Sequence, residues 1–516
     1  MGWLKKALFL FPVLLILFFN TSAQTNTKLK PEPKREFRGV WVATVGNIDW
    51  PTSSHSGSST QIKELIDILD SHQQTGINAV LFQVRPAADA LYAKSREPWS
   101  QWLTGVQGRA PDPMYDPLEI AISEAHKRGI ELHAWMNPYR ATFSAGSSIA
   151  ANNIVNQHPE WFFTYGGQKI FNPGLPEVRE YIIKIVLDVV DNYDVDGIHM
   201  DDYFYPYKID GQRINDSAAY RQYGQSFPNI DDWRRDNVDR MIKMLDDSIH
   251  KHKPHLKFGV SPIGIWKNRS QDPRGSETNG ISTYSELYAD TRKWMMNHWV
   301  DYMNPQIYWQ IGNRVADFTK IVDWWSDNTY DRHLYIGQGP YRSFETSASS
   351  AAFRNTYQLA NQVRYIRNNT RVQGSVFFSS KSIAKNPYGF ADSLKQNFYK
   401  YLALPPVMIW LDSVPPNAPR NLQIKVKPKS AIIAWDTPLL ARDKEPVYGY
   451  VIYRFYQGDR INLDDPKYIL DIKYNTDTTY IDDSIEDGKT YQYVVTAIDR
   501  LKNESYPSIV VNTGDR

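Results

Sequence analysis

Short apolar runs alternate with longer segments of helical periodicity from Phe37 onward. In the first long segment, Ile62, Leu65 and Leu69 recur at a spacing that places them on one face of a helix. The apolar runs predict strands at 37–45, 78–84, 130–135, within 194–207, and at 257–261, 300–307, 333–337 and 374–378. The longer segments predict helices at 59–74, 116–128, 176–192, 231–250, 284–297, 315–327, 347–368 and 391–402.

Eight strand–helix units in strict alternation predict an α/β fold, a closed (β/α)8 TIM barrel over residues 37–404. The alternative is a doubly wound open sheet, but no glycine-rich phosphate loop follows the first predicted strand. The segments after strands two, three and four are long, whereas the returns after the helices are short. Because strand-to-helix loops build the active sites of such barrels, we expect the site at the C-terminal ends of the strands.

The pattern changes after a proline-rich stretch, residues 405–418, which is predicted to be a linker. Beyond it, short segments alternate apolar and polar residues with the period of a β-strand, as at 431–435, 447–454 and 490–499. Residues 419–516 are therefore predicted to form an all-β sandwich. The abrupt change in period also predicts that the two domains are separable.

The N-terminus has the pattern of a secretory signal peptide, predicted to cover residues 1–23. Lys5 and Lys6 precede an apolar run, and small residues end at Ala23. Residues 24–36 are polar and are predicted to be a linker. We expect export across the inner membrane to the periplasm or cell envelope. No stable transmembrane segment is expected in the mature protein, because the apolar run is short for a bilayer.

The amino-acid composition excludes several kinds of binding site and favours one. The 516 residues include 59 Lys and Arg against 57 Asp and Glu, a balance without the basic excess of nucleic-acid-binding proteins. There is no cysteine, which excludes disulfides and thiolate metal sites. The 11 His show no paired ligand spacing, so no metal or cofactor is predicted. Aromatic residues make up 14% of the chain, and a carbohydrate-binding cleft is one use for that surplus.

The predicted strands end in polar groups next to aromatic ones, and several such ends on one face of a barrel would form a polar, aromatic-lined cleft. Amide side chains there would bind sugar hydroxyl or acetamido groups, with turn capping as the structural alternative. The candidate substrate-binding residues are Asp49, Trp50, Arg85, Asp89, Trp135, Asn137, Tyr139, Arg140, His199, Tyr203, Asn304, Gln306, Tyr308, Trp309 and Tyr341.

The stretch 194–207 combines two adjacent acids with four aromatic residues and is the predicted centre of the site. Asp201 and Asp202 follow a short apolar strand, and carboxyl groups perform acid, base and nucleophile work on glycosidic bonds. The alternative is an ordinary turn or helix-cap pair. Side-chain alternation places Asp201 on the face of His199, directed into the barrel, opposite the apolar Met200. Both acids are therefore predicted to be catalytic, with Asp201 central.

The sequence leaves the second carboxylate open. Asp49 and Asp89 lie at strand ends, and Glu286 lies near the helix after strand five, whereas Asp301 begins a strand and belongs at the opposite end of the barrel. The arginines Arg85 and Arg140 have two interpretations: they bind the carboxylate of a lactyl-bearing sugar, or they pair with acids in the cleft wall. His133 and His199 lie in apolar strands, which favours buried hydrogen-bonding roles over metal ligation.

Five segments in this order resemble the glycosyl-hydrolase-like family 10 domain, over roughly residues 35 to 400. They are FRGVWV, VRPAADALY, HAWMNPYR, DGIHMDDYFYP and VDYMNPQIYW, which begin at Phe37, Val84, His133, Asp196 and Val300. The resemblance implies a barrel hydrolase of secreted or envelope-associated bacterial proteins, linked to cleavage of peptidoglycan strands stripped of their peptides.

Two further resemblances are narrower. The C-terminal region is similar to a fibronectin type III module, with Trp435 as its core tryptophan and Tyr491 and Tyr493 in the segment of the corner tyrosine. The strand-four segment is also similar to the Asp-Gly-x-Asp-x-Asp-x-Glu motif of family 18 chitinases. There His199 replaces an acid and Tyr203 replaces the proton-donating Glu, so that mechanism does not transfer directly.

The expected function is that of an exported O-glycosyl hydrolase that acts on a bacterial cell-envelope glycan by carboxylate acid/base catalysis, with peptide-free peptidoglycan strands as substrate. A glycan is the expected partner, and nucleic acid is not. Two alternatives remain: a non-catalytic glycan-binding barrel of the cell surface, and a hydrolase of dietary or plant polysaccharide.

Overall fold

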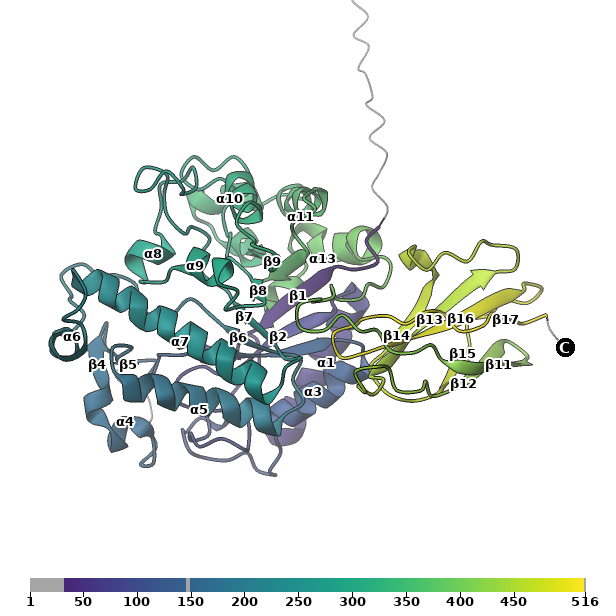
Figure 1. Ribbon diagram of the computed structural model, residues 1–516, viewed down its shortest axis with the longest axis horizontal. Coiled ribbons are helices and arrows are strands. Elements are labelled where there is room, and N and C mark those ends of the chain that lie inside the picture. Colours follow the sequence, from purple (N-terminus) through teal and green to yellow (C-terminus); the bar gives the residue numbers. More distant parts are fainter. Residues whose placement is uncertain (1–31, 145–148, 515–516) are drawn as a thin grey trace, which may run out of the picture.

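The computed structural model describes residues 32–144 and 149–514, which form a barrel domain and a smaller β domain beside it (Figure 1). The predicted signal peptide, residues 1–23, lies outside the described residues, as does most of the segment 24–36. Within the described ranges, none of the helices combines the length and the apolar character needed to cross a bilayer.

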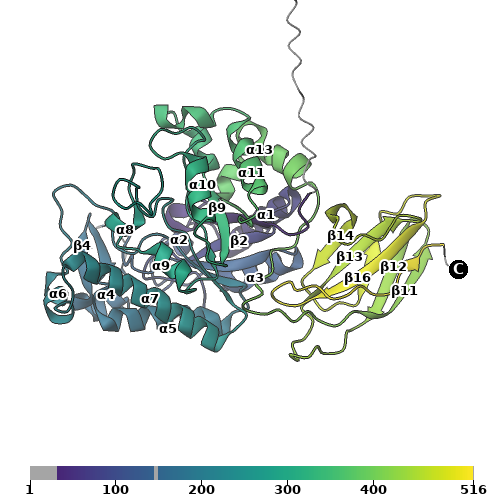
Figure 2. The same ribbon diagram turned by 45° about the horizontal axis from the view of Figure 1, so that its top comes forward.

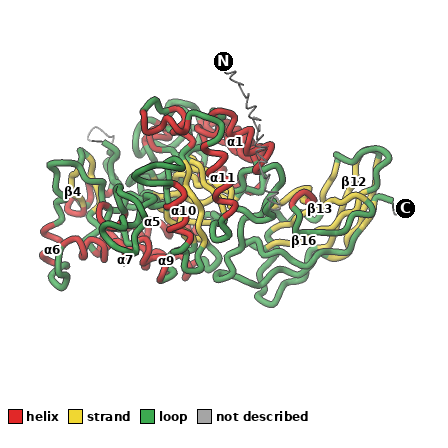
Figure 3. Tube along the Cα trace, turned by 90° about the horizontal axis from the view of Figure 1, so that it is seen from above, coloured by secondary structure: helices red, strands yellow, loops and turns green. Residues whose placement is uncertain are grey.

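Eight parallel strands close into a barrel, and the prediction of a (β/α)8 fold is confirmed. Each strand pairs with the next along the chain, and the last pairs with the first, with Phe37 opposite Gly374. Seen from above, the strands lie at the centre of the domain with helices around them (Figure 3). The barrel strands are β1 (Phe37–Val42), β2 (Ala79–Arg85), β3 (Glu131–Met136), β6 (Gly197–Met200), β7 (Lys257–Val260), β8 (Tyr302–Met303), β9 (His333–Gln338) and β10 (Gly374–Phe377).

Helices follow the strands and cover the outside of the barrel, while shorter elements occupy the loops. The outer helices are α1 (Ser58–Thr75), α3 (Pro117–Lys127), α5 (Pro176–Asn192), α7 (Ile230–His252), α9 (Thr291–Met296), α10 (Phe318–Ser326), α11 (Gln358–Asn368) and α13 (Phe390–Ser393). The shorter elements are α2 (Gln101–Thr104), α4 (Ile154–Gln157), the hairpin β4 (Phe162–Tyr165) and β5 (Gln168–Phe171), α6 (Ser217–Tyr223), α8 (Thr283–Glu286) and α12 (Ser380–Ala384).

The strand predicted at 300–307 is much shorter in the structure, because β8 covers two residues. Pro305 follows closely and has no backbone N–H to contribute to a ladder. Pairing resumes only as isolated bridges from Gln306 to Ile263 and to Gly337. The chain after β8 therefore turns outward early, which brings Gln306 to the rim of the barrel.

The helix predicted at 284–297 is two helices, α8 and α9, separated by a break. Tyr288 has a φ of 53°, in the left-handed region that cannot continue a right-handed helix. Asp290 then caps α9, since its side chain accepts a hydrogen bond from the backbone N–H of Lys293. The spacing of apolar residues predicted one continuous helix. The left-handed backbone at Tyr288 interrupts it, and apolar spacing does not reveal such an interruption.

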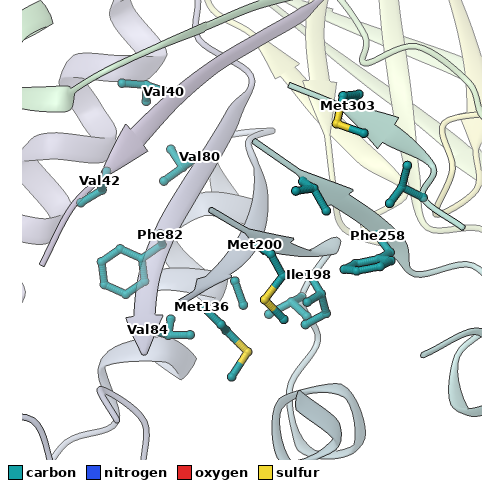
Figure 4. Close-up of a cluster of buried hydrophobic side chains, with 14 of the residues drawn as sticks. Val40, Val42, Val80, Phe82, Val84, Met136, Ile198, Met200, Phe258 and Met303 are labelled. Carbon is teal, nitrogen blue, oxygen red and sulfur yellow. The ribbon is translucent and has the colours of Figure 1, made fainter. Parts of the chain in front are cut away.

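Side chains of the barrel strands alternate between two buried clusters. On β6, Ile198 and Met200 point outward into the large cluster between strands and helices (Figure 4). His199, between them, points into the barrel, where Phe37 stacks on Tyr335 with ring centroids 3.9 Å apart. The interior is thus filled by side chains, and aromatic rings dominate its lower half.

The C-terminal domain is a sandwich of two antiparallel sheets, as predicted. Trp435 lies in its core, edge-on to Tyr450 at 5.0 Å between ring centroids. The assignment to the fibronectin type III family stays a prediction. One sheet contains β11 (Arg420–Lys427), β12 (Ser430–Asp436) and β15 (Thr479–Asp482), and the other contains β14 (Ile469–Lys473), β13 (Gly449–Tyr456), β16 (Tyr491–Ile498) and β17 (Val511–Asn512).

The sandwich closes the N-terminal end of the barrel, which we call the barrel floor, and lies beside the barrel in two views (Figures 1 and 2). Met408 and Leu501 belong to the same buried cluster as the aromatic rings inside the barrel. The indole N–H of Trp410 donates to Asp301 over 2.8 Å. The segment 405–418, predicted as a free linker, is therefore packed in part against the barrel, because its apolar side chains complete the floor.

A buried ionic cluster joins the two domains at the same place. The ammonium group of Lys502, after β16, lies 3.1 Å from Glu131 and 3.5 Å from Asp196. Lys257 also binds Glu131, at 2.6 Å. Burial opposes ionisation of Glu131, but the two lysines outweigh it and lower its pKa.

Candidate active site

A cleft of about 470 Å³ opens at the C-terminal ends of the barrel strands, opposite the sandwich. Its residues come from the ends of all eight barrel strands and from the loops that follow them. Among the described residues that line it, the carboxyl groups are those of Asp201 and Asp202. The lining residues are Trp41, Ala43, Val45, Gly46, Ile48, Gln83, Trp135, Arg140, Phe143, Asp201, Asp202, Tyr203, Tyr207, Ser261, Gln306, Tyr308, Tyr341 and Phe378.

Asp201 is held at the end of β6 by donors from β3 and the loop after it. The indole N–H of Trp135 donates to its Oδ2 over 3.1 Å, and the Asn137 amide reaches both oxygens at 3.1 and 3.2 Å. Burial raises the pKa of Asp201, and the neighbouring charge of Asp202 raises it further, to about 6. The group is therefore poised to exchange a proton near neutral pH.

Asp202 is oriented by different elements. Gln306 donates to its Oδ1 over 3.1 Å, and the Tyr207 hydroxyl donates to its Oδ2. Burial raises the pKa of Asp202, while these two hydrogen bonds favour the ionised form. Because burial first, and then the charge of Asp202, disfavours ionisation of Asp201, the two carboxyl groups are not expected to ionise together.

Aromatic rings and one arginine form the walls around the acids. The Arg140 guanidinium lies over the ring of Tyr203, 4.4 Å from its centroid, and forms no ion pair with the described residues. Across the cleft, Tyr341 meets Tyr308 and Phe378 edge-on, at 5.6 and 5.9 Å between centroids. The cleft thus offers flat apolar faces for sugar rings and a cation for an anionic substituent.

A column of polar side chains runs down the barrel axis below the acids. The Tyr302 hydroxyl lies 3.0 Å from Nδ1 of His199 and 2.9 Å from Nδ1 of His133. Nε2 of His199 faces the indole N–H of Trp41 at 3.3 Å, and Nε2 of His133 faces Glu131 at 3.3 Å. Burial lowers the pKa of His199 well below its usual value, so its imidazole is neutral.

The column has one consistent direction of hydrogen bonds. An indole N–H only donates, so Nε2 of His199 accepts and its proton is on Nδ1. That proton is donated to Tyr302, whose hydroxyl donates in turn to His133. His133 then carries its proton on Nε2 and donates to Glu131. The histidines therefore have hydrogen-bonding roles, as their apolar strands indicated.

Of the predicted site residues, eight line the cleft: Asp201, Asp202, Trp135, Arg140, Tyr203, Gln306, Tyr308 and Tyr341. Asn137 lies just behind Asp201 and His199 lies in the column, so both support the site without lining it. The other seven predicted residues do not line this cleft.

Two of these side chains clamp the turn after β1. Asp49 accepts hydrogen bonds from the backbone of Ala43 and from the Ser379 hydroxyl, both over 2.7 Å. Trp50 is fully buried, and its indole N–H donates to the Gln61 carbonyl over 2.8 Å. Both are therefore structural, since their polar atoms are committed to the backbone or to buried neighbours.

Arg85 and Asp89 are not partners, and neither lines the cleft. Arg85 forms a buried ion pair with Glu97 at 2.6 Å and donates to the Asn137 carbonyl. The interpretation of Arg85 as a partner for an acid therefore holds, with Glu97 as that acid. Asp89 accepts from Gln107 over 3.3 Å and is 1% exposed.

Three further predicted residues do not line the cleft. Tyr139 and Asn304 are fully buried, with side-chain polar atoms that have no hydrogen-bond partner among the described residues. Trp309 packs against the large cluster between strands and helices. Each follows a strand as predicted, but its side chain is not among those that line the cleft.

The cleft also contains residues that the sequence did not single out. Trp41 and Gln83 lie on β1 and β2, Ser261 and Phe378 directly follow β7 and β10, and Tyr207 belongs to the stretch 194–207. The sequence could have indicated Trp41, because side-chain alternation along the strand puts it on the same face as Phe37 and Gly39. The sequence contains no comparable indication for Phe378, because a phenylalanine at the end of a strand usually packs into the hydrophobic core.

A (β/α)8 barrel whose cleft holds an acidic pair between aromatic walls is an arrangement that glycoside hydrolases use. The chain belongs to the glycosyl hydrolase-like 10 family, whose model matches residues 36–354. The protein is accordingly a glycoside hydrolase.

Named relatives support this family. The chain is 42% identical to the glycosyl hydrolase YngK of Bacillus subtilis (strain 168), over 92% of both chains. It is 41% identical to the glycosyl hydrolase DigH of Escherichia coli (strain K12), over 61% of this chain and 76% of that one. The solved glycoside hydrolase domain of PgaB (BpsB) from Bordetella bronchiseptica aligns with 70% of this chain and 98% of its own, at 12% identity and a TM-score of 0.46.

Proposed function

We propose that the protein is exported and hydrolyses O-glycosidic bonds of a bacterial cell-envelope glycan, with peptide-free peptidoglycan strands as substrate. The observation that carries the proposal is Arg140, which forms no ion pair among the described residues, beside the two carboxyl groups of the cleft. Asp201 acts as the general acid that protonates the leaving oxygen, Asp202 stabilises the positive charge that develops on the sugar ring, and water adds to that ring to complete the hydrolysis.

The proposed substrate follows from the chemistry of the walls. Peptide-free strands carry a free lactyl carboxylate on alternate sugars, and the Arg140 guanidinium is a cation within reach of the cleft. A peptide on the lactyl group would remove that negative charge and add bulk. The export proposal rests on the charged and apolar pattern of residues 1–23, and recovery of the intact chain with Met1 in a soluble cytoplasmic fraction would contradict it.

The test compares product release from peptide-free strands and from the same strands with the lactyl carboxyl reduced to an alcohol. Arg140→Gln is expected to raise KM on the natural strands roughly 10- to 100-fold, the weight of one charge-assisted hydrogen bond. The same substitution should have little effect on the reduced strands. Equal loss on both would remove the carboxylate from recognition.

Hydrolysis itself is tested by Asp201→Asn, which keeps the shape of the side chain and removes the transferable proton. Turnover is expected to fall by roughly two to four orders of magnitude, as for loss of a general acid. Asp247→Asn is the matched control, because Asp247 is exposed on α7 and pairs with Lys243 at the surface. Asp301 is unsuitable as a control because it holds Trp410 at the barrel floor.

A further inference from the structure

A second, smaller hollow adjoins the cleft and shares a wall with it. Its volume is about 200 Å³, and three residues line both spaces: Arg140, Tyr203 and Tyr207. The rest of its lining belongs to the hairpin of β4 and β5 and to the loop after β6. This side hollow therefore continues the cleft beyond the Arg140–Tyr203 pair.

The hairpin that forms the outer wall of the side hollow is fastened at two places. Arg140 and Ile170 form an antiparallel bridge, which joins β5 to the segment that follows β3. The Tyr165 hydroxyl, on β4, accepts the backbone N–H of Ile209 over 2.7 Å and so joins the hairpin to the loop after β6. Because backbone groups hold both walls, the side hollow is formed without a ligand.

The lining of the side hollow is mostly aromatic and aliphatic. It includes the rings of Tyr165, Tyr203 and Tyr207 and the side chain of Ile209. Among the described residues that line it, none has a carboxyl group, and the charged group is the Arg140 guanidinium. Flat apolar faces beside a cation suit a neutral or anionic sugar ring and disfavour a cationic ligand. Without an acid, this space can hold a sugar but cannot cleave its bond.

We propose that the side hollow is a further sugar-binding subsite, which holds a sugar of the same glycan strand next to those in the cleft. This inference rests on the proposed function and extends it to recognition of strand length. A bond within a strand is cleaved only where sugars on both sides of it are accommodated. The shared wall is also connected to the acids, because the Tyr207 hydroxyl donates to Asp202.

The test measures binding in a calorimeter, with Asp201→Asn in the full chain so that the glycans stay intact. The probes are peptide-free peptidoglycan fragments of two to six sugars. Affinity is expected to rise about 10-fold at the length that first reaches the side hollow, the weight of one ring on an aromatic face. Equal affinity at every length would overturn the subsite and leave the proposed function standing. Absence of binding at every length would also overturn it, and if the natural protein then fails to hydrolyse the strands, the proposed function fails as well.

Substitutions at Ile209 make the test specific to the side hollow. Ile209 is 38% exposed and lines the side hollow but not the cleft. Ile209→Trp adds bulk there, and Ile209→Glu adds a negative charge that repels an anionic strand. Both should abolish the 10-fold rise with length and leave the affinity for the two-sugar fragment unchanged.

The matched controls are Ile509→Trp and Ile509→Glu. Ile509 is 65% exposed and lies on the sandwich, at the end of the barrel opposite the cleft. Both control variants should keep the full rise of affinity with fragment length. A full rise in either Ile209 variant would contradict the assignment of the subsite.

Discussion

The Asp201 carboxyl is buried at the end of β6 and yet lines the cleft. Three donors face it, from Trp135, Asn137 and the backbone of Tyr203, and these favour the ionised form. Burial and the charge of Asp202 oppose them and prevail, which is why the pKa of Asp201 is raised to about 6. Its proton affinity is thus set by burial and by the charge of Asp202, against hydrogen bonds from Trp135 and the backbone of Tyr203.

This balance predicts the pH dependence of the reaction. A general acid must be protonated, so kcat/KM should fall as the pH rises through about 6, the pKa of Asp201. Asp202→Asn removes the charge that raises this pKa, so the fall should begin at lower pH. Both profiles are measured with peptide-free strands at low substrate concentration. If kcat/KM of Asp202→Asn falls at the same pH as that of the natural protein, then burial alone sets the pKa of Asp201.

At the scale of helices and strands, two sequence patterns predicted much of the fold: the spacing of apolar residues and the alternation of side chains along each strand. The alternation of strands and helices gave the barrel, and parity on β6 directed His199 and Asp201 inward. Local sequence failed where the chain turns after a strand, as at Trp50 and Tyr139, whose aromatic rings pack into the core. The orientation of these two side chains depends on strands that are distant in the sequence, so it cannot be predicted from the neighbouring residues.

The column inside the barrel gives a prediction for one element, β8. Tyr302→Phe leaves a donor on His199 and an acceptor on His133 without a partner, and neither can reach water. We expect a loss of about 1–3 kcal/mol in the free energy of unfolding, measured with denaturant. Tyr139→Phe is the matched control, because the buried Tyr139 hydroxyl has no hydrogen-bond partner in the described part of the chain. Equal stability of the two variants would show that the column contributes nothing.

At the scale of the whole molecule, the sandwich is part of the barrel domain's structure. The proline-rich composition of 405–418 predicted a free connection, but composition does not report that Met408 and Leu501 fill the barrel floor. Lys502 adds a buried charge to the same interface. The two domains therefore share a core, and separability is no longer expected.

The shared floor is tested with Lys502→Met. Glu131 and Asp196 would lose a buried cation, and we expect a loss of about 3–5 kcal/mol in the free energy of unfolding. Lys489→Met, which removes an exposed partner of Glu486, should have little effect. A chain ending at Leu404 should show no cooperative unfolding transition. A truncated barrel that unfolds cooperatively at the same denaturant midpoint would contradict this view.

The position of the closing contacts along the chain also sets the order in which the protein can fold. β1 is made first but pairs with β10, and Lys502 emerges later still. Contacts between such distant residues form slowly, because the intervening chain must first be brought together. While the chain is being synthesised, β1 has only one of its two partner strands and the barrel stays open. The barrel therefore cannot complete its closed sheet until β10 has been synthesised.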